Sequence, residues 1–237
     1  MRENERDSHG KSRAIAPARV VTISVVVTAA CVVATYAFAT REDVIYSDVF
    51  PVISETFITK PGSYIAEFCL SFAAWALFAV VWVVKGFLQH KASSNEAWAK
   101  HAGRTAVVGY VGATSLALTA AINYEESLAG HVVVAFTFMF AMVIWVTCVF
   151  AQTWRHPGCA SARSRVVKLI ALIGAWLGVT IFTALSMFVM REKAYSFIGF
   201  GEWLAVLSIL LFCYTMAFDF DAEKASLVLV FDGVSAV

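Results

Sequence analysis

The chain alternates long apolar runs with short polar segments, and this alternation restricts it to a helical membrane protein. Each run has about the 20 residues that a helix needs to cross the hydrocarbon core of a bilayer. Charged residues make up only 15% of the 237 residues, against about a quarter in soluble domains. All four prolines lie outside the runs, as expected because proline breaks helix interiors. The sequence predicts an all-α polytopic protein, a bundle of six transmembrane helices, over residues 20–40, 64–88, 105–122, 131–153, 166–190 and 202–218.

The first run admits two interpretations. It ends in Ala37-Phe38-Ala39, a small-residue pattern typical of a signal-peptidase site. The run is longer than the apolar core of a usual signal peptide, so we favour an uncleaved span. The predicted membrane domain then covers residues 20–221 as one unit.

Lysine and arginine are distributed unequally between the two predicted faces. With the N-terminus in the cytosol, the inner segments carry fourteen of these residues and the outer loops carry four. Positive charge favours the cytosolic side, so both termini are predicted to be cytosolic. Residues 1–19 are then a disordered cytosolic tail, and residues 222–237 a second cytosolic tail. Within this second tail, residues 225–237 are apolar but too short to span the membrane, and would lie on the membrane surface or against a partner.

The outer loop between the first two runs is unusually rich in large apolar residues for a linker. Phe50, Val52, Ile53, Phe57 and Ile58 alternate there with polar residues, which predicts an ordered extracytosolic loop lying over the helix ends. Polar residues of the same predicted face would either line a pocket for a lipid headgroup or hydrogen-bond the loop to the helices. The set is Glu55, Glu67, Asn123, His131 and Glu202. Each charged member of this set, taken singly, could also simply anchor a helix at the membrane interface.

Other classes of function lack the residues they need. No charge lies at mid-bilayer, which argues against an ion or proton pump. His131 has no second histidine on a facing span for haem, and no His/Asp cluster could hold a metal. We expect no cofactor, no metal and, at a net charge of +1, no nucleic-acid partner. The five cysteines form no pair in a polar loop, so no disulfide framework is expected.

Small residues recur at helical spacing in two runs. Gly174 and Gly178 are four apart, and so are the members of a stripe in the third run, Gly109, Ala113, Ala117 and Ala121. Such patterns let helices approach closely in lipid. We expect packing within the bundle, with a seam between copies as the alternative.

The outer loop also carries a family resemblance. Pro51-Val52-Ile53-Ser54-Glu55-Thr56, followed by Pro61, resembles the Pro-x-Ile-Ser-acid-Thr segment of the DRAM/Frag/Sfk family of six-span proteins. Asn123 with His131 resembles the family's outer turn. The last run resembles the family's last span through Glu202-Trp203, Tyr214-Thr215 and Asp219-Phe220. Two departures are Phe57, where the family usually has Gly, and Gly62, where it usually has an acid.

The resemblance implies a mostly non-catalytic family. Some members are similar to plasma-membrane regulators that help place a phosphatidylinositol 4-kinase, others act in lysosomes during autophagy, and one branch acts in the Golgi on the lipid of GPI anchors. We therefore expect a plasma-membrane, endolysosomal or Golgi protein. The residues here that match the family motifs and would carry any shared role are Ser54, Glu55, Thr56, His131, Glu202 and Asp219.

Three functions remain open at this point. The favoured one is regulation of membrane lipid organisation or trafficking, by binding a membrane lipid and a partner protein. The second is a lipid-remodelling enzyme or accessory factor, with Glu55, His131 and Glu202 as acid and base. The third is a structural subunit that docks through residues 225–237. On the inner face, a lipid or partner would meet Tyr214, Asp219 and the basic residues Arg155, Arg163 and Arg165, although the basic residues equally fit plain topology.

Overall fold

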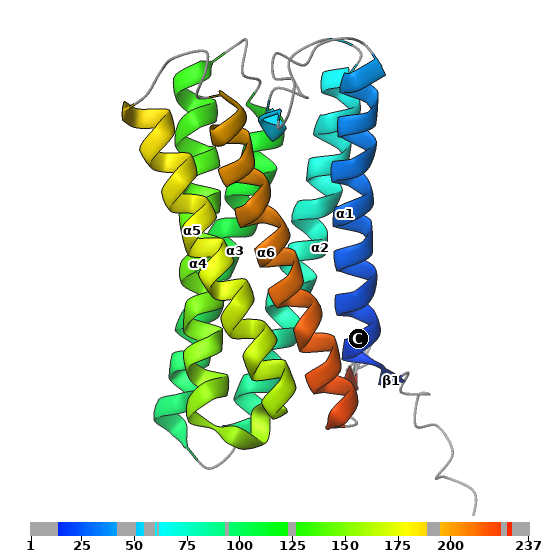
Figure 1. The fold of residues 1–237 in the computed structure, drawn as a ribbon. Coiled ribbons are helices and arrows are strands. Elements are labelled where there is room, and N and C mark those ends of the chain that lie inside the picture. Colours follow the sequence, from blue (N-terminus) through cyan, green and yellow to red (C-terminus); the bar gives the residue numbers. More distant parts are fainter. Residues whose placement is uncertain are drawn as a thin grey trace, which may run out of the picture.

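Six long helices make up most of the chain that the structure describes (Figure 1). The computed structural model describes residues 14–41, 51–54, 60, 62–92, 95–122, 127–188, 195–223 and 227–228. The helices exceed the predicted spans because their polar ends continue the helical turns into the adjoining segments. They are α1 (Pro17–Arg41), α2 (Gly62–Lys91), α3 (Glu96–Ala121), α4 (Leu128–Arg155), α5 (Ala162–Phe188) and α6 (Tyr195–Ala222), with a 3-10 turn η2 (Pro157–Cys159) between α4 and α5.

The helices have the length and composition of a membrane domain. Five of those described, α1, α2, α4, α5 and α6, are long and apolar enough to cross a bilayer. Large apolar side chains cover their outer surface; Trp75 is 75% exposed and Phe68 is 66% exposed. A soluble bundle would bury such residues, whereas lipid solvates them. The chain is therefore an integral, multi-pass membrane protein.

Helix α3 differs from the other five in its first turns. It begins at Glu96, where Asn95 caps it by accepting a hydrogen bond from the backbone of Trp98. Glu96, Lys100 and Arg104 occupy these turns, and much of the remainder is Gly, Ala, Ser and Thr. The polar end is tied to α4, since the Trp98 indole donates a hydrogen bond to Gln152 at 3.2 Å. Low apolar content thus separates α3 from the clearly membrane-spanning helices.

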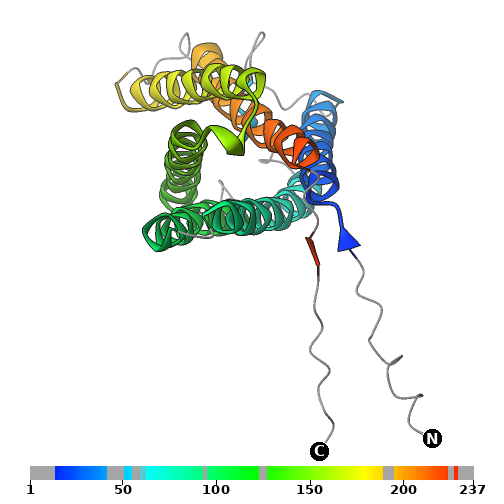
Figure 2. The ribbon, with the colours of Figure 1, turned by 90° about the horizontal axis from the view of Figure 1, so that it is seen from below.

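The helices pack in chain order around one core. Each helix lies against the next, and α1 also packs against α6, which closes the bundle (Figure 2). The core is filled by large side chains from several helices, among them Trp145, Met142, Phe212 and Met216, all at most 1% exposed. Because consecutive helices run in opposite directions, the start of α1 and the end of α6 lie at the same end of the bundle (Figure 1). We call this the terminal end and the other the loop end.

Glycines allow the closest helix contacts, as the small-residue spacing predicts. A Cβ atom on Gly178 of α5 would lie 2.4 Å from the backbone nitrogen of Ala205 in α6, so the two backbones touch. A Cβ atom on Gly109 of α3 would meet Trp145 and Val81 at 2.8 Å. Both predicted small-residue sets therefore contribute contacts inside the bundle.

A two-strand ladder joins the segment before α1 to the segment after α6. Strand β1 (Ala14–Ile15) pairs antiparallel with β2 (Leu227–Val228), and Ala14 faces Val228. Helix α1 begins at Pro17, inside the segment that the sequence assigned to the N-terminal tail. Proline suits that first position because its fixed φ is helical and it has no N–H to leave unpaired.

Candidate functional site

The described part of the outer loop is held on α6 at the loop end. The backbone N–H of Ile53 donates a hydrogen bond to Oε2 of Glu202 at 2.6 Å. The indole of Trp203 donates to the carbonyl oxygen of Pro51 at 2.8 Å. Val52 packs with Phe182 of α5 and Ile198 of α6 in a small apolar cluster. Residues 51–54 are thus fixed by both polar and apolar contacts.

His131 belongs to the first turn of α4 at the same end. Ser127 caps this helix by accepting a hydrogen bond from the backbone of Gly130. The imidazole Nδ1 of His131 lies 2.8 Å from the carbonyl oxygen of Ile122, which closes α3. A carbonyl can only accept, so Nδ1 carries the proton. The side chain is 3% exposed, and the bond fixes the orientation of its ring.

These elements surround a cavity that opens among the helices just beneath residues 51–54. Its empty space, counted together with the part that is open to the outside, is about 750 Å³. Ser54, His131 and Glu202 all line it. The other walls are mostly apolar, with Leu70, Leu116, Ala135, Phe138, Met139, Phe182 and Val206 among them.

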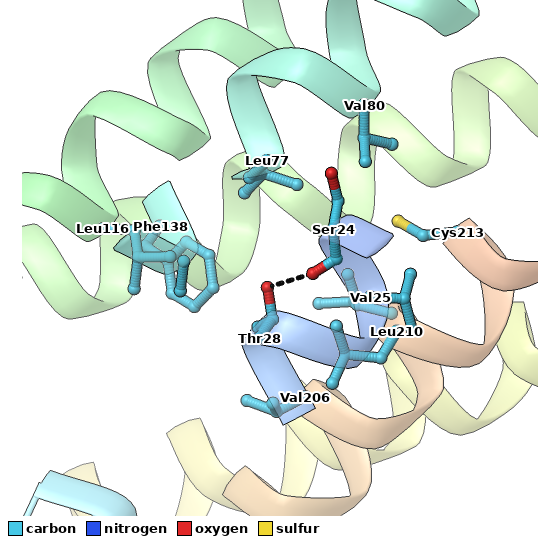
Figure 3. Close-up of a pocket in the computed structure, with 12 residues that line it drawn as sticks. Ser24, Val25, Thr28, Leu77, Val80, Leu116, Phe138, Val206, Leu210 and Cys213 are labelled. Carbon is cyan, nitrogen blue, oxygen red and sulfur yellow. Dashed lines mark hydrogen bonds between the residues drawn. The ribbon is translucent and has the colours of Figure 1, made fainter. Parts of the chain in front are cut away.

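A second cavity of about 450 Å³ continues toward the middle of the bundle (Figure 3). It shares five lining residues with the first: Thr28, Ala73, Leu116, Phe138 and Val206. Its far end is lined by Ser24, Val80 and Cys213, from α1, α2 and α6. The two cavities therefore adjoin along shared walls.

Three threonine hydroxyls along these walls are already used as donors. Thr28 donates to the carbonyl oxygen of Ser24 at 2.8 Å in its own helix (Figure 3). Thr35 donates to the carbonyl oxygen of Cys31, and Thr119 to that of Ser115, in the same manner. Such bonds back to the helix leave the hydroxyl hydrogen with no role in binding a ligand. The walls offer an apolar surface, and the polar character concentrates at the loop end.

The structure gathers some of the predicted outer residues and separates others. Ser54, His131 and Glu202 come together at the cavity. Glu67 is half-exposed on α2 and does not line it. Glu55, Thr56 and Asn123 lie outside the described residues. Within the described chain, no group of His, Cys, Asp and Glu could hold a metal ion.

The predicted inner residues do not form one site. Asp219 pairs with Lys168 between α6 and α5, and both side chains are at most 1% exposed. Tyr214 is 38% exposed and packs its ring against Phe218 of its own helix. The three arginines are spread over the α4–α5 connection: Arg155 and Arg163 are exposed, and Arg165 lies over the ring of Trp154.

Sequence reasoning missed the partner of Asp219 and several cavity residues. In the sequence, Lys168 is only one of the positive charges of the inner face. In the structure it pairs with Asp219 and also donates to Ser164 at 2.7 Å. Its position inside an apolar run was a usable signal, because a buried lysine needs an acidic partner. Thr35, Cys31, Cys69 and Thr119 line the cavity without any motif that marks them.

Comparison with known proteins finds one family. The family model described as Frag1/DRAM/Sfk1/Cwh43P N-terminal domain matches residues 17–223, from the start of α1 to just past the end of α6. No curated protein and no solved structure matches the chain.

Proposed function

We propose a function for this chain, which belongs to the Frag1/DRAM/Sfk1/Cwh43P N-terminal domain family. It is a non-catalytic regulator of membrane lipid organisation or trafficking. It acts by binding one membrane lipid inside the bundle and a partner protein at the terminal end. The headgroup lies at the loop end, against Ser54, His131 and Glu202.

The observation that carries this proposal is the polarity of the cavity. Its polar lining lies under residues 51–54, and its deeper walls are apolar. A lipid has the same division between a polar headgroup and an apolar chain. The carboxylate of Glu202 suits a headgroup that brings hydrogen-bond donors or a positive charge, such as hydroxyl groups or an amine.

The orientation in the membrane is part of the proposal. All six helices span, α3 included, since its neighbours α2 and α4 are apolar spans that it connects. The terminal end faces the cytosol, because the arginine- and lysine-rich segments belong to it. The bound headgroup therefore faces the lumen or the outside of a plasma, endolysosomal or Golgi membrane. At the cytosolic end, exposed Arg155 and Arg163 would meet anionic lipid or a protein partner.

A second candidate is a lipid-remodelling enzyme. One observation favours it: His131 and Glu202, from helices far apart in sequence, line the same cavity as a base and an acid would. This function requires that the bound lipid be cleaved or transferred, and not merely held.

Native mass spectrometry of the protein in mild detergent, with identification of retained lipids, tests the proposal. We expect one class of lipid on the wild type, and loss of it in His131→Ala and in Glu202→Gln. Glu202→Gln keeps a neutral acceptor for the Ile53 N–H, so it removes the charge while loosening the loop less than Glu202→Ala would. Glu67→Gln is the matched control, because Glu67 lies outside the cavity lining.

Three other outcomes would redirect the assignment. A lipid that stays bound in both cavity variants contradicts the headgroup site. Conversion of the added lipid by the wild type, abolished by either substitution, establishes the enzyme. A lipid-free chain that is recovered only with another protein supports the structural-subunit alternative.

A further inference from the structure

Building on the proposed lipid site, we propose that the protein selects its lipid by the length of one acyl chain. The chain enters at the loop end, follows the two adjoining cavities along the bundle axis, and stops against Ser24, Val80 and Cys213.

The first argument is continuity. The five residues shared by the two cavities come from α1, α2, α3, α4 and α6, so helices surround the junction on several sides. Helices surrounding the passage keep the enclosed chain away from the bilayer. A second chain of the same lipid would stay outside the bundle.

The second argument is depth. Each of three helices contributes a residue to the mouth and another to the far end. These pairs are Thr35 and Ser24 in α1, Cys69 and Val80 in α2, and Glu202 and Cys213 in α6. Both members of every pair are eleven positions apart, which is about 16 Å at 1.5 Å per residue. One leaflet of a ~30 Å hydrocarbon core has about the same thickness. The passage therefore runs about as deep as one leaflet.

The third argument is closure at the far end. About one helical turn beyond it, Val21, Val84 and Met216 are at most 1% exposed and belong to the main core. A well-packed core resists extra methylene groups. A chain longer than the passage would have to displace these side chains or leave carbons outside the mouth.

The test uses the full-length protein in detergent and a homologous series of lysophosphatidylcholines, which carry one acyl chain, read out by native mass spectrometry. A methylene that moves from water into an apolar cavity contributes ~0.8 kcal/mol, or about a fourfold gain in affinity, and one that moves from a detergent micelle contributes less because the micelle is already apolar. We expect affinity to rise with chain length and then to stop rising at a limit. Free fatty acids of the same lengths form a second arm, which separates a lipid with a headgroup from a free acid.

Two substitutions at one position should move the limit in opposite directions. Val80→Phe fills the far end and should weaken binding of the longest chains at least tenfold while leaving short ones within about twofold. Val80→Ala should move the limit to longer chains. Cys213→Leu repeats the filling from α6 in case Val80→Phe folds poorly. Val133→Phe adds the same volume on the lipid-facing surface, where Val133 is 64% exposed, and should change nothing.

The outcomes separate this inference from the proposed function. Binding that is sensitive to Glu202→Gln but keeps rising with length, or that has the same limit in all Val80 variants, overturns length selection and leaves the headgroup site standing. No binding of any chain by the folded wild type overturns both.

Discussion

Lys168 of α5 and Asp219 of α6 form an ion pair that is sealed inside the bundle near its terminal end. Lys168 also donates to the hydroxyl of Ser164, one turn earlier in α5. The pair joins the two helices that pack together most extensively. Two charges in such a place depend on each other, because removing one leaves the other buried without compensation.

Asp219→Ala should therefore destabilise the protein strongly, by about 3–5 kcal/mol in the free energy of unfolding. The apolar double substitution Lys168→Met with Asp219→Leu should recover most of that loss, since it removes both charges. Unfolding in mixed detergent, followed by circular dichroism, measures the difference. Asp221→Ala is the control, because Asp221 is exposed two residues further along α6. Equal stability of Asp219→Ala and wild type would show that the pair is absent.

Glu202→Ala should release residues 51–54 from the helix ends. The Ile53 N–H would lose its acceptor, and its exchange with deuterium should accelerate, while Glu202→Gln keeps a neutral acceptor and should exchange at an intermediate rate. Hydrogen exchange read by mass spectrometry gives the rate. Glu67→Ala should leave it unchanged, and unaltered exchange in Glu202→Ala would contradict the contact.

Gly178→Ala should weaken the bundle, because the new methyl group would meet the backbone of α6 at 2.4 Å and 2.7 Å. Overpacking of this kind costs about 1–3 kcal/mol. Gly86→Ala in α2 is the matched control: nothing lies within 4 Å of its added Cβ atom, so better helix propensity should stabilise it by up to ~1 kcal/mol. Thermal unfolding of both variants in the same detergent measures the contrast, and similar melting of the two would argue against the close crossing.

Cys31 and Cys69 should cross-link under a mild thiol oxidant. Cys31 of α1 and Cys69 of α2 both line the first cavity, close enough for one thiol to influence the other. Oxidation would remove two hydrogens and join the sulfur atoms, which peptide mapping detects. Added lipid should slow the reaction if it occupies the cavity. Cys148 and Cys213 provide the comparison. Cross-links from Cys31 or Cys69 to either of them at the same rate would contradict the pairing.

Cys159 should react slowly with maleimide at neutral pH. Burial raises the pKa of its thiol. The positive charge of Lys91 lowers this pKa, and the negative charges of Glu223 and Asp219 raise it. A raised pKa leaves less thiolate, so the rate should climb only at more alkaline pH than for an ordinary thiol. Lys91→Ala should slow the reaction further and Glu223→Gln should speed it. If both substitutions changed the reaction rate in the same direction, the cause would be access to the thiol and not charge.

The helices could be predicted from the sequence because the apolar runs leave few alternatives in a membrane. Apolar Val52 and Ile53 in an otherwise polar loop predict a loop that lies over the helix ends. In its described part, Val52 packs in a cluster with Phe182 and Ile198, and the Ile53 N–H donates to Glu202. His131 and Glu202 each begin a predicted span on the same predicted face, and both line the first cavity.

What the sequence could not supply was the direction in which each helix faces. A helix that is apolar on all sides, as these are, gives no stripe to mark its inner face. Glu67 therefore looked equivalent to Glu202, yet it misses the cavity lining. Lys168 looked like one more inner charge until the packing of α5 on α6 placed it beside Asp219. The cavity itself depends on the fit of six helices, which no single run encodes.

The short ladder between β1 and β2 has a consequence for how the chain could be re-engineered. Ala14 and Val228 are direct neighbours, so the boundaries of the membrane domain meet at one point. A short linker would be enough to join them, and new ends could be opened in another connection without separating any packed helices. Fluorescent reporters inserted beside the two strands would sit close enough for energy transfer, and that signal would fall if α1 ever moved away from α6.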